Sequence, residues 1–336
     1  MNAGRTAAIF GTAGPDLLPE ERDFFREADP FGFILFARNV ETPEQLRRLT
    51  AALRDAVGRE APVLVDQEGG RVQRLRAPHW REWAPPFDTV AACATPGQAE
   101  AVMALRAALI AAELRAVGID ADCAPVADLA REGTHPFLKN RCYSTDPAVV
   151  AGIGRAMADA FLAGGVLPVV KHMPGHGRSV LDTHHQLPVV TAGRDELMAT
   201  DFAPFRALSD LPMAMTAHVV FRAIDDRPAT QSPAVIGLIR EEIGFGGLLM
   251  TDDLNMEALS GTLASRTAAA IAAGCDMALH CKGDLAQMQE VAAAAGAPTA
   301  AARRRAEAAL AARRAAPVVD VAALEDRLRA AGGQIA

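Results

Sequence analysis

Short apolar runs alternate with helix-like stretches along the chain, and this alternation constrains the fold more than any other feature of the sequence. The runs that we interpret as strands are Ala7–Phe10, Gly32–Phe36, Pro62–Asp66, Ile119–Ala124, Val166–His172, Met213–Val219, Gly247–Asp252 and Asp276–His280. The stretches with helical patterns are Pro19–Glu27, Pro43–Gly58, Gln98–Gly118, Pro147–Gly164, Asp201–Ser209, Pro233–Ile243, Leu263–Gly274 and Asp284–Ala294. Several of these stretches begin at a proline or an acidic first turn and end at a glycine, such as Gly58, Gly118 and Gly274, as helices commonly do.

The number and order of these elements predict an α/β fold of the closed (β/α)8 barrel (TIM barrel) type, because eight strands, each followed by a helix, are the pattern of that fold. Continuous apolar runs, such as PVLV at 62–65 and LPVV at 167–170, suit strands buried on both faces of a parallel sheet. A doubly wound sheet with an extra helical region is the competing architecture, but no G-x-G-x-x-G motif follows a strand. No linker is long enough to separate domains. We therefore expect one domain over residues 1–336, with C-terminal helices at about 298–333 packed on it.

The charge and the cysteine content limit the partners and the compartment. A net charge of −7 and a pI near 5.7 argue against nucleic acid or an anionic membrane as the main partner. No apolar run is long enough to span a membrane, and Ala7–Phe10 is too short for the core of a signal peptide. Five scattered cysteines without C-x-x-C spacing suit reduced thiols. We expect a cytoplasmic protein that is a monomer or a weak homo-oligomer, in which the arginines at 303–305 and 313–314 form a solvated helix face.

Polar residues occur where the predicted strands end. In a (β/α)8 barrel the carboxyl ends of the strands form the catalytic face. The residues at these ends are Asp66, Lys171, His172, His218, Asp252, Asp253 and His280. A charged residue that follows several buried apolar ones is costly unless it is paired or used. A structural ion pair explains any single case, but the whole set indicates a polar pocket for a hydroxyl-rich ligand.

Four of the eight histidines lie in one segment, KHMPGHGRSVLDTHHQL at Lys171–Leu187. His172 and His176 have the spacing of metal ligands on a helix, but the intervening Pro174 and Gly175 prevent a regular helix. Lys171, which adjoins the first histidine, would also repel a cation. We therefore expect no metal and no cofactor, and a metal-dependent hydrolase remains an alternative.

Acid–base chemistry suits the same segment better. Asp182 precedes His184 by two residues, and a carboxylate at that distance can orient an imidazole and raise its basicity. A histidine of this kind donates and accepts protons near neutral pH. Asp252 directly follows an apolar strand, where it is a candidate nucleophile for attack on an anomeric carbon, although paired acids also cap helices or bind cations.

Three motifs together resemble those of a known family. DQEGGRVQRL at 66–75, KHMPGHG at 171–177 followed by DTHHQLP at 182–188, and TDDLNM at 251–256 are similar to the motifs of family 3 glycoside hydrolases. The resemblance runs in order from about Gly11 to His280. It is nearest to the single-domain bacterial β-N-acetylhexosaminidases (β-N-acetylglucosaminidases) of peptidoglycan recycling. Larger members carry a second, sandwich-like domain, for which this chain has no room.

The resemblance implies a role for individual residues. Asp252 would be the nucleophile that forms a glycosyl–enzyme intermediate, His184 the general acid/base, and Asp182 its partner. The residues implied as substrate contacts are Asp66, Arg74, Arg141, Lys171 and His172. His176 is expected to brace the loop, and His185 has no assigned role. The segment KNRCYSTDP around Arg141 matches the family only loosely, and Met173 stands where phenylalanine is common.

These implications give a leading hypothesis and three alternatives. The leading one is a retaining exo-β-N-acetylglucosaminidase that releases GlcNAc from GlcNAc-1,6-anhydroMurNAc fragments, with or without peptide. A β-N-acetylglucosaminide phosphorylase is the nearest alternative, because a histidine acid/base tolerates an incoming phosphate better than a carboxylate does. The others are the metal-dependent hydrolase and a catalytically silent sugar-binding barrel.

Overall fold

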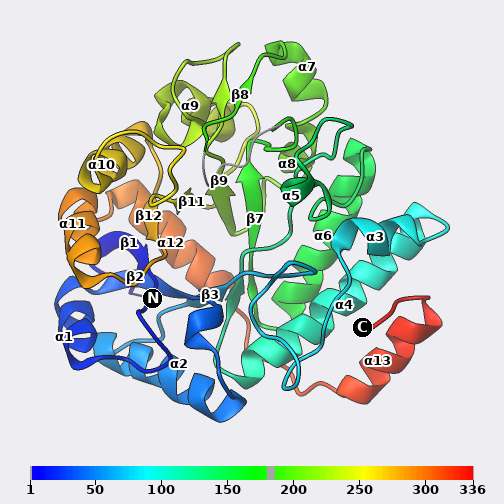
Figure 1. Cartoon of the computed structure of the whole chain (residues 1–336), viewed down its shortest axis with the longest axis horizontal. Coiled ribbons are helices and arrows are strands. Elements are labelled where there is room, and N and C mark those ends of the chain that lie inside the picture. The colour runs from blue at the N-terminus through cyan, green and yellow to red at the C-terminus, as the bar shows by residue number, and fades with distance from the viewer. Residues whose placement is uncertain (1, 180–185, 336) are drawn as a thin grey trace.

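The computed structural model describes residues 2–179 and 186–335. Within these residues eight parallel strands close into one barrel, and helices surround it (Figure 1). In their order around the barrel the strands are β1 (Thr6–Phe10), β12 (Met277–His280), β11 (Leu248–Asp253), β9 (Met213–Thr216), β7 (Leu167–Met173), β6 (Ala121–Asp122), β3 (Val63–Val65) and β2 (Pro30–Leu35). Each lies within or overlaps one of the eight predicted runs, so the predicted (β/α)8 barrel is confirmed.

The helices outside the barrel follow the predicted stretches closely. They are α1 (Pro19–Ala28), α2 (Pro43–Val57), α4 (Pro96–Ala116), α6 (Pro147–Ala163), α8 (Ala203–Ala207), α9 (Pro233–Glu241), α10 (Leu263–Ala273) and α11 (Leu285–Ala295). Helix α2 illustrates the local signals. The Thr42 side chain accepts a hydrogen bond from Gln45 N, Pro43 occupies the first turn, and Gly58 ends the helix with φ of 65°.

Several short elements were not predicted. They are η1 (Ala37–Asn39), β4 (Gln67–Gly69), β5 (Val72–Gln73), α3 (Pro86–Ala91), α5 (Pro136–Lys139), β8 (Val189–Val190), α7 (Arg194–Ala199), β10 (Val220–Phe221) and η2 (Ala229–Gln231). All are too short for a hydrophobic period to reveal them. They belong to segments that leave the carboxyl ends of β2, β3, β6, β7 and β9, and they therefore shape the catalytic face of the barrel.

The C-terminal residues form two helices, α12 (Ala300–Ala312) and α13 (Val321–Ala330). Helix α13 packs against α4. The expectation that the arginines of this segment form a solvated face is wrong for two of them. Arg305 binds Asp276 at 2.6 Å, and Arg313 binds Asp120 at 2.5 Å. The two aspartates are each 2% exposed and directly precede β12 and β6, so these arginines join α12 to the amino end of the barrel.

Among residues 2–179 and 186–335, no helix combines the length and the apolar character needed to cross a membrane.

Candidate active site

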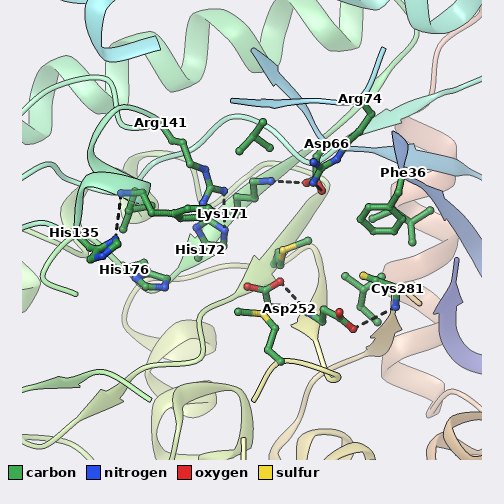
Figure 2. A pocket seen from close by; sticks show the side chains of 18 residues that line it. Phe36, Asp66, Arg74, His135, Arg141, Lys171, His172, His176, Asp252 and Cys281 are labelled. Atoms are coloured by element: carbon green, nitrogen blue, oxygen red, sulfur yellow. Dashed lines mark hydrogen bonds and ion pairs between the residues drawn. The ribbon is translucent and has the colours of Figure 1, made fainter. Parts of the chain in front are cut away.

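A cavity of about 160 Å³ opens among the carboxyl ends of the strands (Figure 2). Its lining residues are Ile34, Phe36, Asp66, Val72, Arg74, His135, Phe137, Leu138, Arg141, Lys171, His172, His176, Met215, Asp252, Asp253, Met256, Leu279 and Cys281. Figure 2 shows Asp252 facing the Lys171–Asp66 pair across the cavity, with Phe36 and Cys281 at one end and His135 and His176 at the other. The charged side chains thus face one another across a cavity whose walls also carry apolar side chains such as Ile34, Met215 and Leu279.

The structure brings together most of the residues that the sequence indicated. The predicted contacts and the predicted nucleophile that line the cavity are Asp66, Arg74, Arg141, Lys171, His172 and Asp252. Asp182, His184 and His185 lie outside the described residues. The roles of all these residues remain predictions.

Asp66 is held by two cations. Lys171 Nζ lies 2.7 Å from its Oδ1, and Arg74 Nη2 lies 3.0 Å from its Oδ2. Burial disfavours the charged form of Asp66, but the charges of Lys171 and Arg74 outweigh burial and hold its pKa below the usual range. The carboxylate is therefore an acceptor fixed in place, suited to the hydroxyl groups of a sugar.

Glu68 is a site residue that the sequence reasoning missed. Its carboxylate accepts two hydrogen bonds from Arg141, of 2.7 and 2.8 Å, and lies 2.6 Å from Lys171 Nζ. Glu68 is 2% exposed and does not line the cavity. Its pKa is lowered because the charges of Arg141 and Lys171 outweigh the cost of burial. Glu68 thus orients Arg141 and Lys171, two cations that do face the cavity. The feature of the sequence that could have indicated Glu68 is its position two residues after Asp66.

Asp128 is a second missed residue. Its Oδ2 accepts a hydrogen bond of 2.7 Å from His172 Nδ1, and its Oδ1 accepts one of the same length from His176 N. This pairing fixes the orientation of the His172 ring and places Nε2 3.4 Å from Arg141 Nη2. The signal in the sequence was an isolated acid after the apolar run at 124–127.

Asp252 and Asp253 end β11 and differ in their protonation. One oxygen of Asp252, Oδ1, accepts a hydrogen bond of 2.8 Å from Asp253 N. Burial disfavours the charge of Asp252, but the imidazoles of His218 and His172 outweigh it and lower its pKa. Burial raises the pKa of Asp253 to about 6, and the charge of Asp252 adds to this. At neutral pH Asp252 is therefore the more strongly ionised carboxylate, with its second oxygen available in the cavity.

Three histidines do not lie as the sequence suggested. His218 and His280 do not line the cavity: His218 is fully buried between Thr230 and the carbonyl of Asp253, and His280 Nε2 lies 3.2 Å from Gln287 Oε1. His280 ends β12 next to Leu279, which lines the cavity, and neighbouring side chains of a strand point to opposite faces. His218 lies two residues beyond β9, behind the Asp252–Asp253 pair. His176 was expected only to brace the loop, but its ring lines the cavity beside His172, 5.5 Å away. Burial lowers the pKa of His176 to about 4, which keeps the ring neutral at physiological pH.

The described residues do not bring three histidine, cysteine, aspartate or glutamate side chains together in an arrangement that could hold a metal ion.

Comparison with known proteins agrees with this architecture. Residues 20–314 match the N-terminal domain of glycosyl hydrolase family 3. A β-hexosaminidase of Alkalilimnicola ehrlichii is 41% identical over 280 residues, which are 81% of this chain and 80% of that protein. One from Stenotrophomonas maltophilia is 39% identical over 283 residues, 82% of this chain and 84% of that protein.

Solved structures give the same result. NagZ from Neisseria gonorrhoeae, in complex with N-trifluoroacetyl-D-glucosamine, superposes with a TM-score of 0.84 at 30% identity and covers 98% of both chains. A family 3 β-N-acetylglucosaminidase from a Paenibacillus species gives a TM-score of 0.80 at 30% identity, over 98% of this chain and 62% of that longer one. The chain therefore belongs to glycosyl hydrolase family 3 and is a glycoside hydrolase that acts on β-N-acetylhexosaminides.

Proposed function

We propose that the protein is a retaining exo-β-N-acetylglucosaminidase that releases terminal GlcNAc from peptidoglycan fragments such as GlcNAc-1,6-anhydroMurNAc, with or without peptide. The observation that carries this proposal is the position of Asp252, an ionised carboxylate at the end of β11 that faces the paired Lys171 and Asp66 side chains across one cavity. A cavity of about 160 Å³ suits a single terminal sugar rather than the interior of a polymer.

The first chemical step forms a bond between Asp252 and the anomeric carbon. The oxygen of Asp252 that does not bind Asp253 N attacks this carbon, and the bond to the leaving oxygen breaks as His184 gives that oxygen its proton. A water molecule then attacks the glycosyl–Asp252 ester while His184 takes a proton from it, and this step regenerates the free carboxylate. Asp182 supports His184 in both steps.

The sugar is held by the residues opposite Asp252. Asp66 accepts hydrogen bonds from hydroxyl groups, and Arg74, Arg141 and Lys171 donate to hydroxyls or to the acetamido carbonyl. His172, which lines the same side of the cavity, contacts a hydroxyl group of the sugar. The ligand named in the Neisseria gonorrhoeae complex, N-trifluoroacetyl-D-glucosamine, supports an N-acylated glucosamine in this position.

We also propose a cytoplasmic location. All five cysteines are free thiols, and Cys123, Cys142 and Cys275 are buried. Cysteines that form no disulfide support a reducing compartment, because disulfides are common in oxidising compartments and rare in the cytosol. Fractionation of the native cell tests this: activity in the cytosolic fraction supports it, and activity confined to the envelope or the medium contradicts it.

The reaction is tested by the products formed from GlcNAc-1,6-anhydroMurNAc. Proton NMR at early times is expected to show β-GlcNAc before it mutarotates, because two displacements restore the configuration. GlcNAc-1-phosphate formed in phosphate buffer would identify the phosphorylase alternative instead. Loss of activity on thorough chelation, restored by added metal, would identify the metal-dependent alternative. Failure to cleave either this substrate or an aryl β-GlcNAc would refute the proposal.

A further inference from the structure

One arginine beside the cavity has no part in the chemistry proposed above. The guanidinium carbon of Arg71 lies 3.8 Å from the centroid of the Phe137 ring, and Phe137 lines the cavity. Arg71 is exposed, and within the described part of the chain no carboxylate forms an ion pair with it. Arg74 and Arg141, by contrast, each bind a carboxylate. Arg71 is therefore a cation whose charge is available to a ligand.

The Phe137 ring connects this arginine with the sugar-binding groups. The buried Arg141 guanidinium lies 5.5 Å from the same ring centroid, so the ring contacts both a buried cation of the cavity and an exposed one. Helix α5 carries Phe137, and Phe137 N donates a hydrogen bond of 3.2 Å to His135 Nδ1. A guanidinium that lies on an aromatic ring keeps its N–H groups directed outward around its edge, where they can bind a carboxylate in bidentate fashion.

The charge balance of the cavity indicates why such a cation is useful. Asp252 and Asp253 both line the cavity, and burial keeps Asp253 only partly ionised near pH 6. The negative charge of an anionic leaving group would be repelled by at least one of these carboxylates. A cation at the rim offsets that repulsion without adding charge at the anomeric centre.

We propose that Arg71, stacked on Phe137, forms a subsite for the second sugar and binds the carboxylate that this sugar carries. The inference rests on the proposed function, because the 1,6-anhydroMurNAc unit bears a lactyl carboxylate. The subsite selects anionic aglycones, and Phe137 fixes the orientation of the guanidinium.

A matched pair of substrates tests the subsite: GlcNAc-1,6-anhydroMurNAc and its lactyl methyl ester. The measured quantity is the ratio of kcat/KM for the acid to that for the ester, since any general effect of a substitution cancels in this ratio. The wild-type enzyme is expected to favour the acid roughly tenfold, as one partly exposed charge-assisted hydrogen bond allows. Arg71→Gln is expected to bring the ratio to about one, and Arg71→Lys to give an intermediate ratio because lysine keeps only the charge.

Arg303→Gln on α12 is the control, because it makes the same change of charge at an exposed arginine outside the cavity. Arg303→Gln should keep the wild-type ratio. In both the wild type and Arg303→Gln, 0.5 M NaCl should lower this ratio, because salt screens the attraction between charges. A wild-type ratio near one, or a wild-type ratio preserved in Arg71→Gln, overturns the subsite alone. Cleavage of aryl β-GlcNAc but of neither disaccharide overturns the proposed substrate and the subsite together.

Discussion

The Glu68 carboxylate accepts two hydrogen bonds from one edge of the Arg141 guanidinium, of 2.8 Å from Nε and 2.7 Å from Nη2. The two residues are 73 positions apart in the chain and are joined across the catalytic face of the barrel. Because Glu68 also lies 2.6 Å from Lys171, it shares its charge between two cations that line the cavity. The direction in which Arg141 and Lys171 point therefore depends on a residue that does not itself line the cavity.

Replacing Glu68 tests this dependence. In Glu68→Gln, the side chains of Lys171 and Arg141 lose the anion that they share and are no longer held in one orientation. We expect kcat/KM for aryl β-GlcNAc to fall by about 10²-fold, because a displacement of positioning groups by about 1 Å has an effect of that size. Steady-state kinetics with circular dichroism separates this from misfolding. Glu82→Gln, which removes a carboxylate bound to Arg76 outside the cavity, is the control. A fall of less than threefold in Glu68→Gln would show that the cations are oriented by other groups.

Removing Asp128 should lower stability. The carboxylate accepts hydrogen bonds from His172 Nδ1 and from His176 N, and Asp128→Ala leaves these buried donors without it. We expect the free energy of unfolding in urea to fall by about 3 kcal/mol. Asp226→Ala, at an exposed position, should change it by less than about 0.5 kcal/mol. Equal effects of the two substitutions would contradict the importance of this contact.

Asp276 should matter for stability but not for chemistry. Arg240, Arg305 and the backbone N of Leu249 all bind this buried carboxylate at the amino end of the barrel. Asp276→Asn removes the negative charge that lies between two arginines. We expect the free energy of unfolding to fall by about 3 kcal/mol. Thermal unfolding measures the loss, while kcat at a temperature well below the transition should remain at the wild-type value. A large fall in kcat of the folded variant would contradict this separation.

Asp122 should make stability depend on pH. Burial raises the pKa of Asp122 to about 8, above the value of about 4 expected in the unfolded chain. Between these values the folded state holds a proton that the unfolded state does not, so this group makes stability fall as pH rises from about 4 to 8. Asp122→Asn cannot ionise, and its fall in stability from pH 5 to 8.5 should be shallower than that of the wild type. Parallel urea-unfolding profiles of the two proteins would contradict the raised pKa.

The sequence predicted the barrel well because the information for it is local. The run at 167–170 and the start and stop signals at Pro43 and Gly58 each act within a few residues, and the structure confirms the elements that they indicate. The short helices α3, α5 and α7 were not predicted, since four to six residues carry too little periodicity. Helix α5 matters most among them, because it carries Phe137 into the cavity.

The site could be predicted only in part, because its remaining members depend on contacts between distant segments. Asp66, Lys171 and Asp252 each come at the end of an apolar run, and that position alone predicts that they lie at the catalytic face. Glu68 and Asp128 act through partners far along the chain, which spacing cannot reveal. His280 also ends a strand, but side-chain alternation turns it away from the cavity, while His218 lies beyond β9 and is held by Thr230 and the Asp253 carbonyl.

Asp252 as the covalent nucleophile is the central claim, and trapping the intermediate tests it most directly. A fluorinated GlcNAc donor with a good leaving group should form a glycosyl–enzyme ester that hydrolyses slowly, and mass spectrometry of the digested protein locates it. We predict one sugar per chain, attached to Asp252. A sugar on Asp253, or a donor that is turned over with no residue labelled at any time, would contradict the account.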